Sequence, residues 1–195
     1  MSSIPTLILA SNSPRRQQLL KDLGFDFEVF TRDFDESFPD ELPAMEVAEY
    51  LAIKKNKNYR ELRPQDLIIT SDTTVICENH VLNKAADKTE ARNMLSMLSG
   101  KTHQVVSGVC VSSPEKNISF SDSTAVTFDI ITEQEMNYYI DHFKPFDKAG
   151  AYGIQEWIGM AKISAISGSY FTVMGLPTHR LFKVLTEDFG YQLNT

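Results

Sequence analysis

The residues of this chain best suited to chemistry lie near its start. A short apolar run, Leu7-Ile8-Leu9, leads into Ser11-Asn12-Ser13-Pro14-Arg15-Arg16. This pattern predicts a strand, a tight loop and a helix with Ser13 as its N-cap and Pro14 in its first position. Two arginines in a first helical turn lie at the positive end of the helix dipole, which is unfavourable unless an anion occupies the N–H groups there. An anion-binding turn is one interpretation, and the other is that both guanidiniums extend into water.

Further polar side chains along the chain could act on the same anion. They are Asp35, Glu36, Lys55, Asp72 after a second apolar run, Lys84, and Lys148 and Gln155 in a late loop of small residues. Lysines and arginines offset phosphate charge, whereas carboxylates hold a divalent cation through oxygen and can activate water. The mixture therefore favours hydrolysis of a phosphate anhydride.

Taken singly, these residues have simpler interpretations. Asp72 could be a turn or cap residue, and Lys55 could lay its stem along a helix and keep its ammonium in water. Lys84, near a turn, could be a solvated surface residue. The chain has no GxGxxG, no GxxxxGK[ST] loop, no HExxH and no GxSxG, which removes the commonest cofactor and hydrolase interpretations.

Composition indicates an ordinary globular protein. With 195 residues, 42% of them apolar, the chain fits one domain, 1–195, or two closely joined lobes. The 26 acidic and 19 basic side chains give a net charge of -7, so we expect no binding to nucleic acid. No apolar run is long enough for a membrane span and no secretory signal is evident, so we expect no membrane partner and a cytoplasmic location. Cys77 and Cys110 alone predict a reducing compartment rather than a disulfide framework.

Hydrophobic periodicity predicts an α/β protein with a mixed sheet. Helices are expected over 14–23, 43–59, 87–99 and 132–143 and from 177, and strands over 7–9, 25–30, 66–77, 81–84, 103–111, 119–131 and 161–166. The apolar stripe of the second helix passes through Lys55, with Lys54 at its edge. Ligands of α/β sheets gather beyond the carboxyl ends of strands, so Ser11 and Asp72 would face one cleft if their strands are neighbours.

Five ordered segments then identify a resemblance. They are Leu9-Ala10-Ser11-Asn12-Ser13-Pro14-Arg15-Arg16, Ser71-Asp72-Thr73, Leu98-Ser99-Gly100-x-x-His103, Lys148-Ala149-Gly150-Ala151-Tyr152-Gly153-Ile154-Gln155, and Gly168-Ser169-Tyr170 with Gly175-Leu176-Pro177. With these segments the chain resembles the Maf family of nucleoside triphosphate pyrophosphatases over nearly its whole length. The resemblance implies an elongated mixed sheet flanked by helices around a central cleft, as in inosine triphosphatases and anticodon-binding domains.

The resemblance also implies a reaction, cleavage of a nucleoside triphosphate between its α and β phosphates with a divalent metal, Mg or Mn. It assigns Asp72 as proton acceptor and Glu36, Lys55 and Lys84 to the handling of metal and phosphate, with Glu36 and Asp72 as the metal residues. Substrate binding and choice fall to Ser11, Arg15, Arg16, Thr73, Lys148 and Gln155. Ile154-Gln155 is similar to the branch that acts on dTTP and UTP, and the family resemblance implies a homodimer.

The chain also departs from the family pattern. Asn83-Lys84-Ala85 stands where Gly-Lys-Pro is common, and Glu156-Trp157 follow Gln155 where a glycine is usual. The acidic loop aligns loosely, so Asp35 is an alternative to Glu36. The rival function is a regulatory nucleotide-binding protein that acts in cell division or septum formation, with incidental hydrolysis.

Overall fold

The computed structural model describes residues 5–193, and within it the chain forms two compact units. Unit 1 contains the described residues up to Asp72, Ser107–Asp122 and the chain from Gly175 onward. Unit 2 contains Thr73–Val106 and Ser123–Met174. The chain therefore passes between the units several times, and neither unit is a continuous stretch of sequence.

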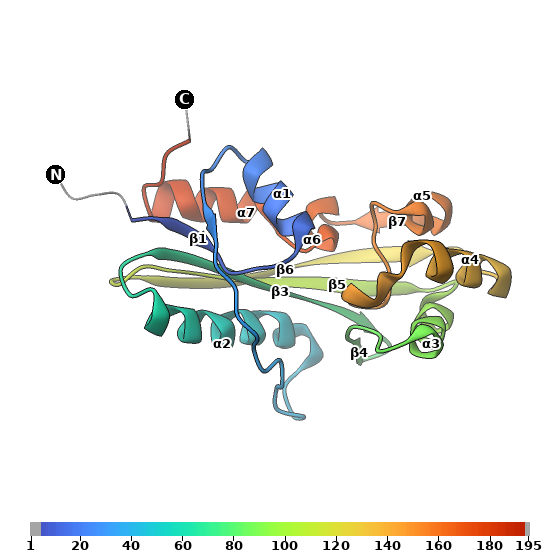
Figure 1. The fold of residues 1–195 in the computed structure, drawn as a ribbon. Coiled ribbons are helices and arrows are strands. Elements are labelled where there is room, and N and C mark those ends of the chain that lie inside the picture. The colour runs from blue at the N-terminus through green and yellow to red at the C-terminus, as the bar shows by residue number, and fades with distance from the viewer. Residues whose placement is uncertain (1–4, 194–195) are drawn as a thin grey trace. The chain divides into compact units, whose positions relative to one another are not determined.

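Unit 1 is built around strand β1 (Leu7–Leu9), which pairs in parallel with β2 (Glu28–Val29) and with β3 (Leu67–Cys77). Helices α1 (Pro14–Asp22) and α7 (Thr178–Lys183) lie over one face of these strands, and α2 (Val47–Leu62) lies over the other (Figure 1). A 3₁₀ turn at Ala44–Glu46 precedes α2, and a π turn at Val184–Asp188 follows α7. Helices therefore cover both faces of β1, which is fully buried, whereas both residues of the edge strand β2 are exposed.

Unit 2 combines four α-helices with two strands and parts of others. It contains α3 (Lys88–Leu98), α4 (Glu133–Phe143), a 3₁₀ turn at Pro145–Asp147, α5 (Trp157–Lys162) and α6 (Tyr170–Met174). Strand β4 (His80–Leu82) pairs antiparallel with β3, and β7 (Ile163–Ser167) pairs antiparallel with β6 (Asn117–Phe128). Its core joins α3 and α4 through side chains such as Leu95, Leu98 and Tyr139.

The strands form one mixed sheet of seven in the order β2-β1-β3-β5-β6-β7, with β4 on β3 and β5 at Thr102–Ser112. β3, β5 and β6 each contribute residues to both units. Parallel pairs around β1 and antiparallel pairs at β4 and β7 confirm the predicted α/β class with a mixed sheet.

Local sequence signals mark the helix ends as expected. The Ser13 hydroxyl accepts a hydrogen bond from Arg16 N, Pro14 opens α1, and Gly24 follows its end at φ +85°. Thr132 and Glu135 form a complete capping box at α4. These four helix signals are confirmed.

Other elements differ from their predicted bounds. The strand predicted over 25–30 is only Glu28–Val29, because Phe25 packs against Phe182 and Tyr191 instead of extending it. The strand predicted over 161–166 begins at Ile163, after the unpredicted helix α5. Helices of six residues or fewer are too short for a 3.6-residue period to emerge from the pattern.

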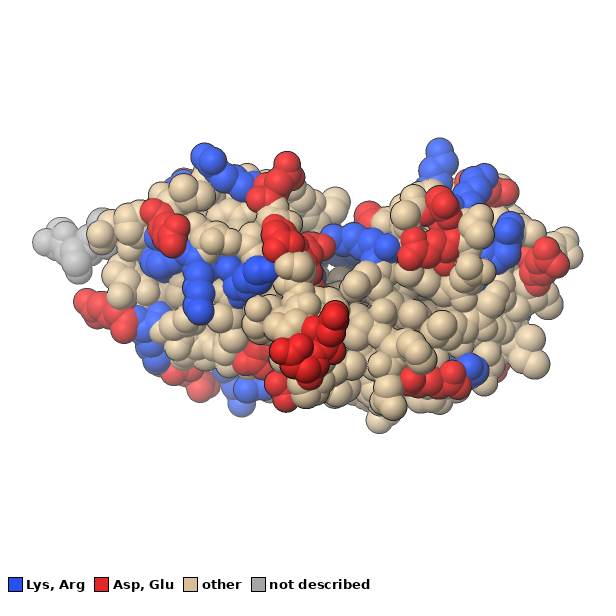
Figure 2. Space-filling model, turned by 90° about the horizontal axis from the view of Figure 1, so that it is seen from below, with Lys and Arg blue, Asp and Glu red and all other residues tan. Residues whose placement is uncertain are grey.

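The surface facing the viewer in Figure 2 carries lysine and arginine interspersed with aspartate and glutamate. This face has no broad basic area of the kind that binds nucleic acid. Over residues 5–193, none of the helices has the length and apolar character needed to cross a membrane.

Candidate active site

The neighbouring strands β1 and β3 place the first site residues of unit 1. β1 and β3 run in parallel with Leu9 opposite Ile69, and Ala10 N donates to Ile69 O at 2.9 Å. Ser11 lies just beyond the end of β1, whereas Asp72 lies within β3, which continues to Cys77 instead of ending before Asp72. The prediction that their strands are neighbours is confirmed.

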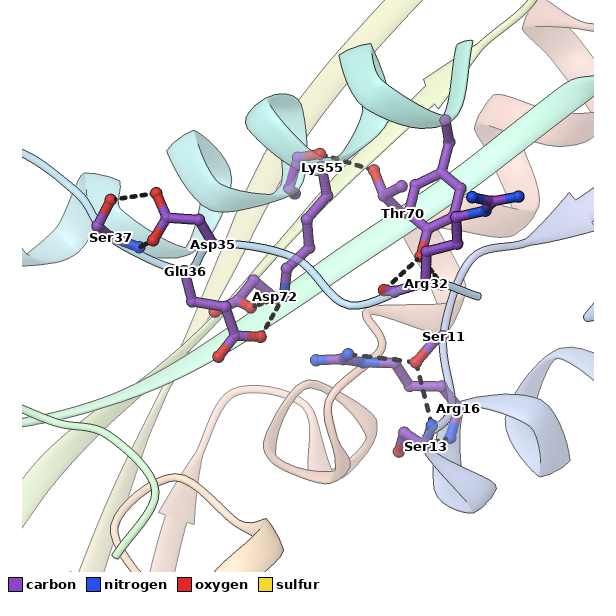
Figure 3. A network of polar contacts seen from close by, with 12 residues as sticks. Ser11, Ser13, Arg16, Arg32, Asp35, Glu36, Ser37, Lys55, Thr70 and Asp72 are labelled. Carbon is purple, nitrogen blue, oxygen red and sulfur yellow. Dashed lines mark hydrogen bonds and ion pairs between the residues drawn. The ribbon is translucent and has the colours of Figure 1, made fainter. Parts of the chain in front are cut away.

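Lys55 lies between two carboxylates. Its Nζ is 2.5 Å from Asp72 Oδ1 and 2.8 Å from Glu36 Oε1 (Figure 3). The side chains of Lys55 and Asp72 are only 11% and 13% exposed, and charges so far from water must be paired. The alternative in which the Lys55 ammonium extends into water is wrong for this structure.

The buried face of α2 explains why Lys55 turns inward. Ala48, Leu51 and Ala52 are almost wholly buried, and Lys55 follows Leu51 by four residues, on the same face. The Thr70 hydroxyl donates to Ala52 O at 2.7 Å, which ties the turn before Lys55 to β3. A Cβ on Gly108 would lie 2.3 Å from the Ala48 carbonyl carbon, so α2 packs directly against the backbone of β5.

The acidic loop before α2 is held by Asp35 and presents Glu36. The Asp35 carboxylate accepts hydrogen bonds from Ser37 N, Ser37 Oγ and Lys54 Nζ, the last at 3.0 Å. These contacts, those of Ser37 first, lower the pKa of Asp35 to about 2. The two consecutive lysines of α2 thus form ion pairs with two consecutive carboxylates, Lys54 with Asp35 and Lys55 with Glu36. Of the two candidates, Glu36 is the carboxylate brought to Asp72.

Arg16, in α1, extends its guanidinium toward the carboxylates of Asp72 and Glu36 (Figure 3). Its Nε donates to Gly175 O at 2.8 Å, and Ser71 Oγ donates to the same carbonyl at 3.2 Å. Burial lowers the pKa of Arg16, while the negative charges of Asp72 and Glu36 act in the opposite direction. Arg15, its neighbour in the first turn, is half-buried.

Unit 2 groups two of the predicted lysines. Lys84 forms an isolated antiparallel bridge with Ala149, and Gly150 N donates to Leu82 O at 3.0 Å. The segment around exposed Lys84 is therefore fixed to the loop that begins at Lys148, despite the departure from Gly-Lys-Pro. Lys148 itself is buried, and its Nζ is 2.7 Å from Asp147 Oδ1 and 3.1 Å from Glu156 Oε1.

Gln155 and Thr73 complete the predicted set. The Gln155 Oε1 atom is buried, and no donor among the described residues reaches it. Such an unsatisfied amide oxygen is costly unless something else donates to it. Thr73 follows Asp72 in β3 and is the first residue of unit 2.

Within unit 1, the predicted residues Ser11, Arg16, Glu36, Lys55 and Asp72 come together, while Lys84, Lys148 and Gln155 belong to unit 2. The contacts that the sequence did not predict include Ser71 with Gly175, Asp35 with Lys54, and Glu156 with Lys148. Each residue lies in or beside a segment that carries the family resemblance or its departures, but no local pattern indicates the pairing.

A bound divalent cation fits the donor set of unit 1 in part. Among residues 5–193, no three His, Cys, Asp or Glu side chains are grouped to hold a metal. Two carboxylates, Glu36 and Asp72, nevertheless converge on the one ammonium of Lys55. Mg²⁺ commonly binds through one or two carboxylates and takes its remaining ligands from water and substrate phosphates. The pair fits a cation that binds together with a phosphate ligand.

Comparisons with known proteins agree with the sequence motifs. A family model described as Maf-like protein matches residues 6–188. A curated protein of Phocaeicola vulgatus named dTTP/UTP pyrophosphatase is 50% identical over 92% of this chain and 94% of its own length. One of the same name from Parabacteroides distasonis is 48% identical over the same shares.

Among solved structures, the Ham1 protein of Staphylococcus aureus is 16% identical, with a TM-score of 0.49 over 63% of this chain and 71% of that one. Protein VC0702 of Vibrio cholerae is 9% identical, with a TM-score of 0.47 over 97% and 99% of the two chains.

Proposed function

Since the chain belongs to the Maf-like family, we propose that it hydrolyses dTTP and UTP to the nucleoside monophosphate and pyrophosphate. The observation that carries this proposal is the Lys55 ammonium held between Asp72 and Glu36 beside the guanidinium of Arg16. This group of side chains contains cations that can bind the phosphates. It also contains carboxylates that can activate water and bind a metal ion.

In the proposed reaction Asp72 is the general base. Lys55 donates to Asp72 Oδ1 and orients the carboxylate. Asp72 accepts a proton from the water that attacks the α-phosphorus. As the new P–O bond forms, the bond from that phosphorus to the bridging oxygen breaks, and pyrophosphate leaves with the electron pair.

Arg16 and Lys55 offset the negative charge that the phosphates bring. The hydrogen bond from Arg16 Nε to Gly175 O fixes the plane of the guanidinium before the substrate arrives, and fixed donors need no reorganisation during the reaction. Ser11, whose hydroxyl contacts both Ser13 N and Arg16 Nη1, shapes the turn between β1 and α1. The part of Lys84 in phosphate binding rests on its match to the family motif.

Glu36 and Asp72 would hold the divalent cation, Mg or Mn. When bound, such an ion neutralises phosphate charge and polarises the P–O bonds. The test is activity after chelation with EDTA and after readdition of each metal. Activity that persists undiminished in EDTA would remove the metal from the proposal.

Base choice is assigned to Gln155, with Arg15 and Thr73, through their match to the family positions. A glutamine amide both donates and accepts, as the edge of uracil or thymine does, and Gln155 Oε1 is a buried acceptor that no donor within residues 5–193 reaches. Lys148 is assigned to the same substrate-binding loop. We further propose a homodimer in the cytoplasm, on the family resemblance; light scattering of the purified protein tests the dimer.

The deciding experiment measures pyrophosphate release from a panel of nucleoside triphosphates by the wild type, Asp72→Asn and Asp66→Asn. Asp66 is a matched control because it is also ion-paired in unit 1, with Arg63, but lies just before the first residue of β3. Asp72→Asn should lower kcat by about 100- to 10,000-fold with the fold intact, and Asp66→Asn should not. Tight nucleotide binding by the wild type without any product would instead favour the regulatory binding protein.

A further inference from the structure

Glu156 directly follows Gln155, and its carboxylate binds back to the beginning of the loop that carries Gln155. Glu156 Oε1 is 3.1 Å from Lys148 Nζ, at the beginning of the loop. Glu156 Oε2 accepts a hydrogen bond from the hydroxyl of Tyr139 in α4, and the same hydroxyl accepts one from Gly153 N at 3.0 Å. The Glu156 side chain thus connects the two ends of the loop to each other and to α4, and Tyr139 of α4 connects them to Gly153 in the middle of the loop.

This carboxylate is shielded from water. Glu156 is 17% exposed in its side chain and Lys148 is 8% exposed, while Tyr139 is wholly buried. Burial, then the hydrogen bond to Glu156 and then its charge, raise the pKa of Tyr139, so its hydroxyl stays protonated as a donor to the carboxylate. Removal of one partner from a buried ion pair is strongly destabilising, because the other charge then stays buried without a partner.

The Glu156 carboxyl and the Gln155 amide lie against the same point of the backbone. A Cβ on Gly153 would be 2.9 Å from Glu156 Cδ and 3.2 Å from Gln155 Nε2. The two side chains are therefore neighbours over Gly153, and a shift of Glu156 gives the amide room to rotate. Glu156 is also the N-cap residue of α5, and Gly159 N donates to its carbonyl oxygen at 3.0 Å, which fixes the backbone that follows the loop.

We propose that Glu156 is a positioning residue for base selection, which fixes the Gln155 amide in the orientation that recognises a pyrimidine with an N3–H and an O4. This inference rests on the proposed function and deepens it. Glu156 acts through Lys148, Tyr139 and Gly153 rather than on the substrate. A family member with a glycine at the position of Glu156 has no carboxylate there to make these contacts.

The test compares kcat and KM for UTP, dTTP and CTP in the wild type, Glu156→Ala and Glu156→Gln. Glu156→Ala should raise KM for UTP by about tenfold with kcat within about twofold, and the preference for UTP over CTP should fall by about the same factor. Glu156→Gln retains an acceptor for the Tyr139 hydroxyl but not the charge opposite Lys148, so it should lie between. A general loss of stability would not produce this split between KM and kcat.

Glu135→Gln is the matched control. Glu135 pairs with Lys162 at 2.6 Å in the same unit, without contact to the loop from Lys148 to Gln155, and its loss should leave base preference unchanged. If Glu156→Ala does not fold, the Glu156→Gln comparison decides. Wild-type base preference retained in the folded variants overturns the role of Glu156 alone, whereas a wild type inactive on every nucleotide overturns the proposed function.

Discussion

Arg16 and Ser71 donate hydrogen bonds to the same acceptor, the carbonyl oxygen of Gly175. The three residues come from α1, β3 and the segment before α7, all in unit 1. The carbonyl receives Arg16 Nε at 2.8 Å and Ser71 Oγ at 3.2 Å. The orientation of the guanidinium thus depends on a loop more than 150 residues away in the chain, and Ser71 holds that loop in place.

Ser71→Ala is expected to weaken substrate binding through Arg16. It removes one donor from Gly175 O, and a neutral hydrogen bond contributes about 1 kcal/mol, so kcat/KM should fall by about fivefold. Steady-state kinetics with UTP check this. Ser119→Ala is the control, since the Ser119 hydroxyl also makes a hydrogen bond in unit 1, to Glu49. Equal effects of the two substitutions would count against a role for Ser71 in holding Arg16.

Asp35 and Glu36 are neighbours with different expected effects. Asp35→Asn loosens the loop held by Ser37 and Lys54, so Glu36 is less well placed and activity should fall by about threefold to tenfold. Glu36→Gln removes the charge beside Lys55 itself, and we expect a larger loss together with a higher metal requirement. Metal titrations of activity for both variants check this. A higher metal requirement for Asp35→Asn than for Glu36→Gln would indicate that Asp35, not Glu36, serves the cation.

Local signals predicted much of what positions the site. The N-cap at Ser13, the proline after it and Gly24 gave the bounds of α1 because capping depends on residues within one turn. The apolar stripe of α2 placed Lys55 on the same face as Leu51, which is the buried face, although the sequence left open whether its ammonium extends into water. These features follow from a few neighbouring residues.

The remaining contacts join residues that are far apart in the sequence. The Arg16 bond to Gly175 spans 159 positions, and the pairing of Lys55 with Asp72 and Glu36 depends on how α2 packs against β3. Phe25 belonged to a strand pattern but packs on Phe182 and Tyr191, because burial of aromatic surface outweighs a local preference. A single sequence carries no local record of such partners.

Gly108→Ala should destabilise unit 1. The added methyl group would lie 2.3 Å from the Ala48 carbonyl carbon, and overpacking of this kind costs about 1–3 kcal/mol. Urea denaturation followed by circular dichroism measures the change in the free energy of unfolding. Because α2 would move, Lys55 would shift relative to Asp72. Activity should therefore fall by more than the loss of stability alone explains. A variant with wild-type stability would show that α2 does not lie directly on β5.

His103 predicts how the stability of unit 2 depends on pH. The buried ring contacts the Tyr152 hydroxyl at 2.7 Å and the ring of Phe128, and burial lowers its pKa from 6.5 to about 4. Between these values the unfolded chain binds the proton and the folded chain does not. The contribution of His103 is therefore complete above pH 6.5 and is lost as the pH falls toward 4, by at most about 1.4 kcal/mol per pH unit. His103→Gln should flatten this slope in urea denaturation, whereas the exposed His142→Gln should retain it, and a slope unchanged in His103→Gln would assign the pH dependence to other groups.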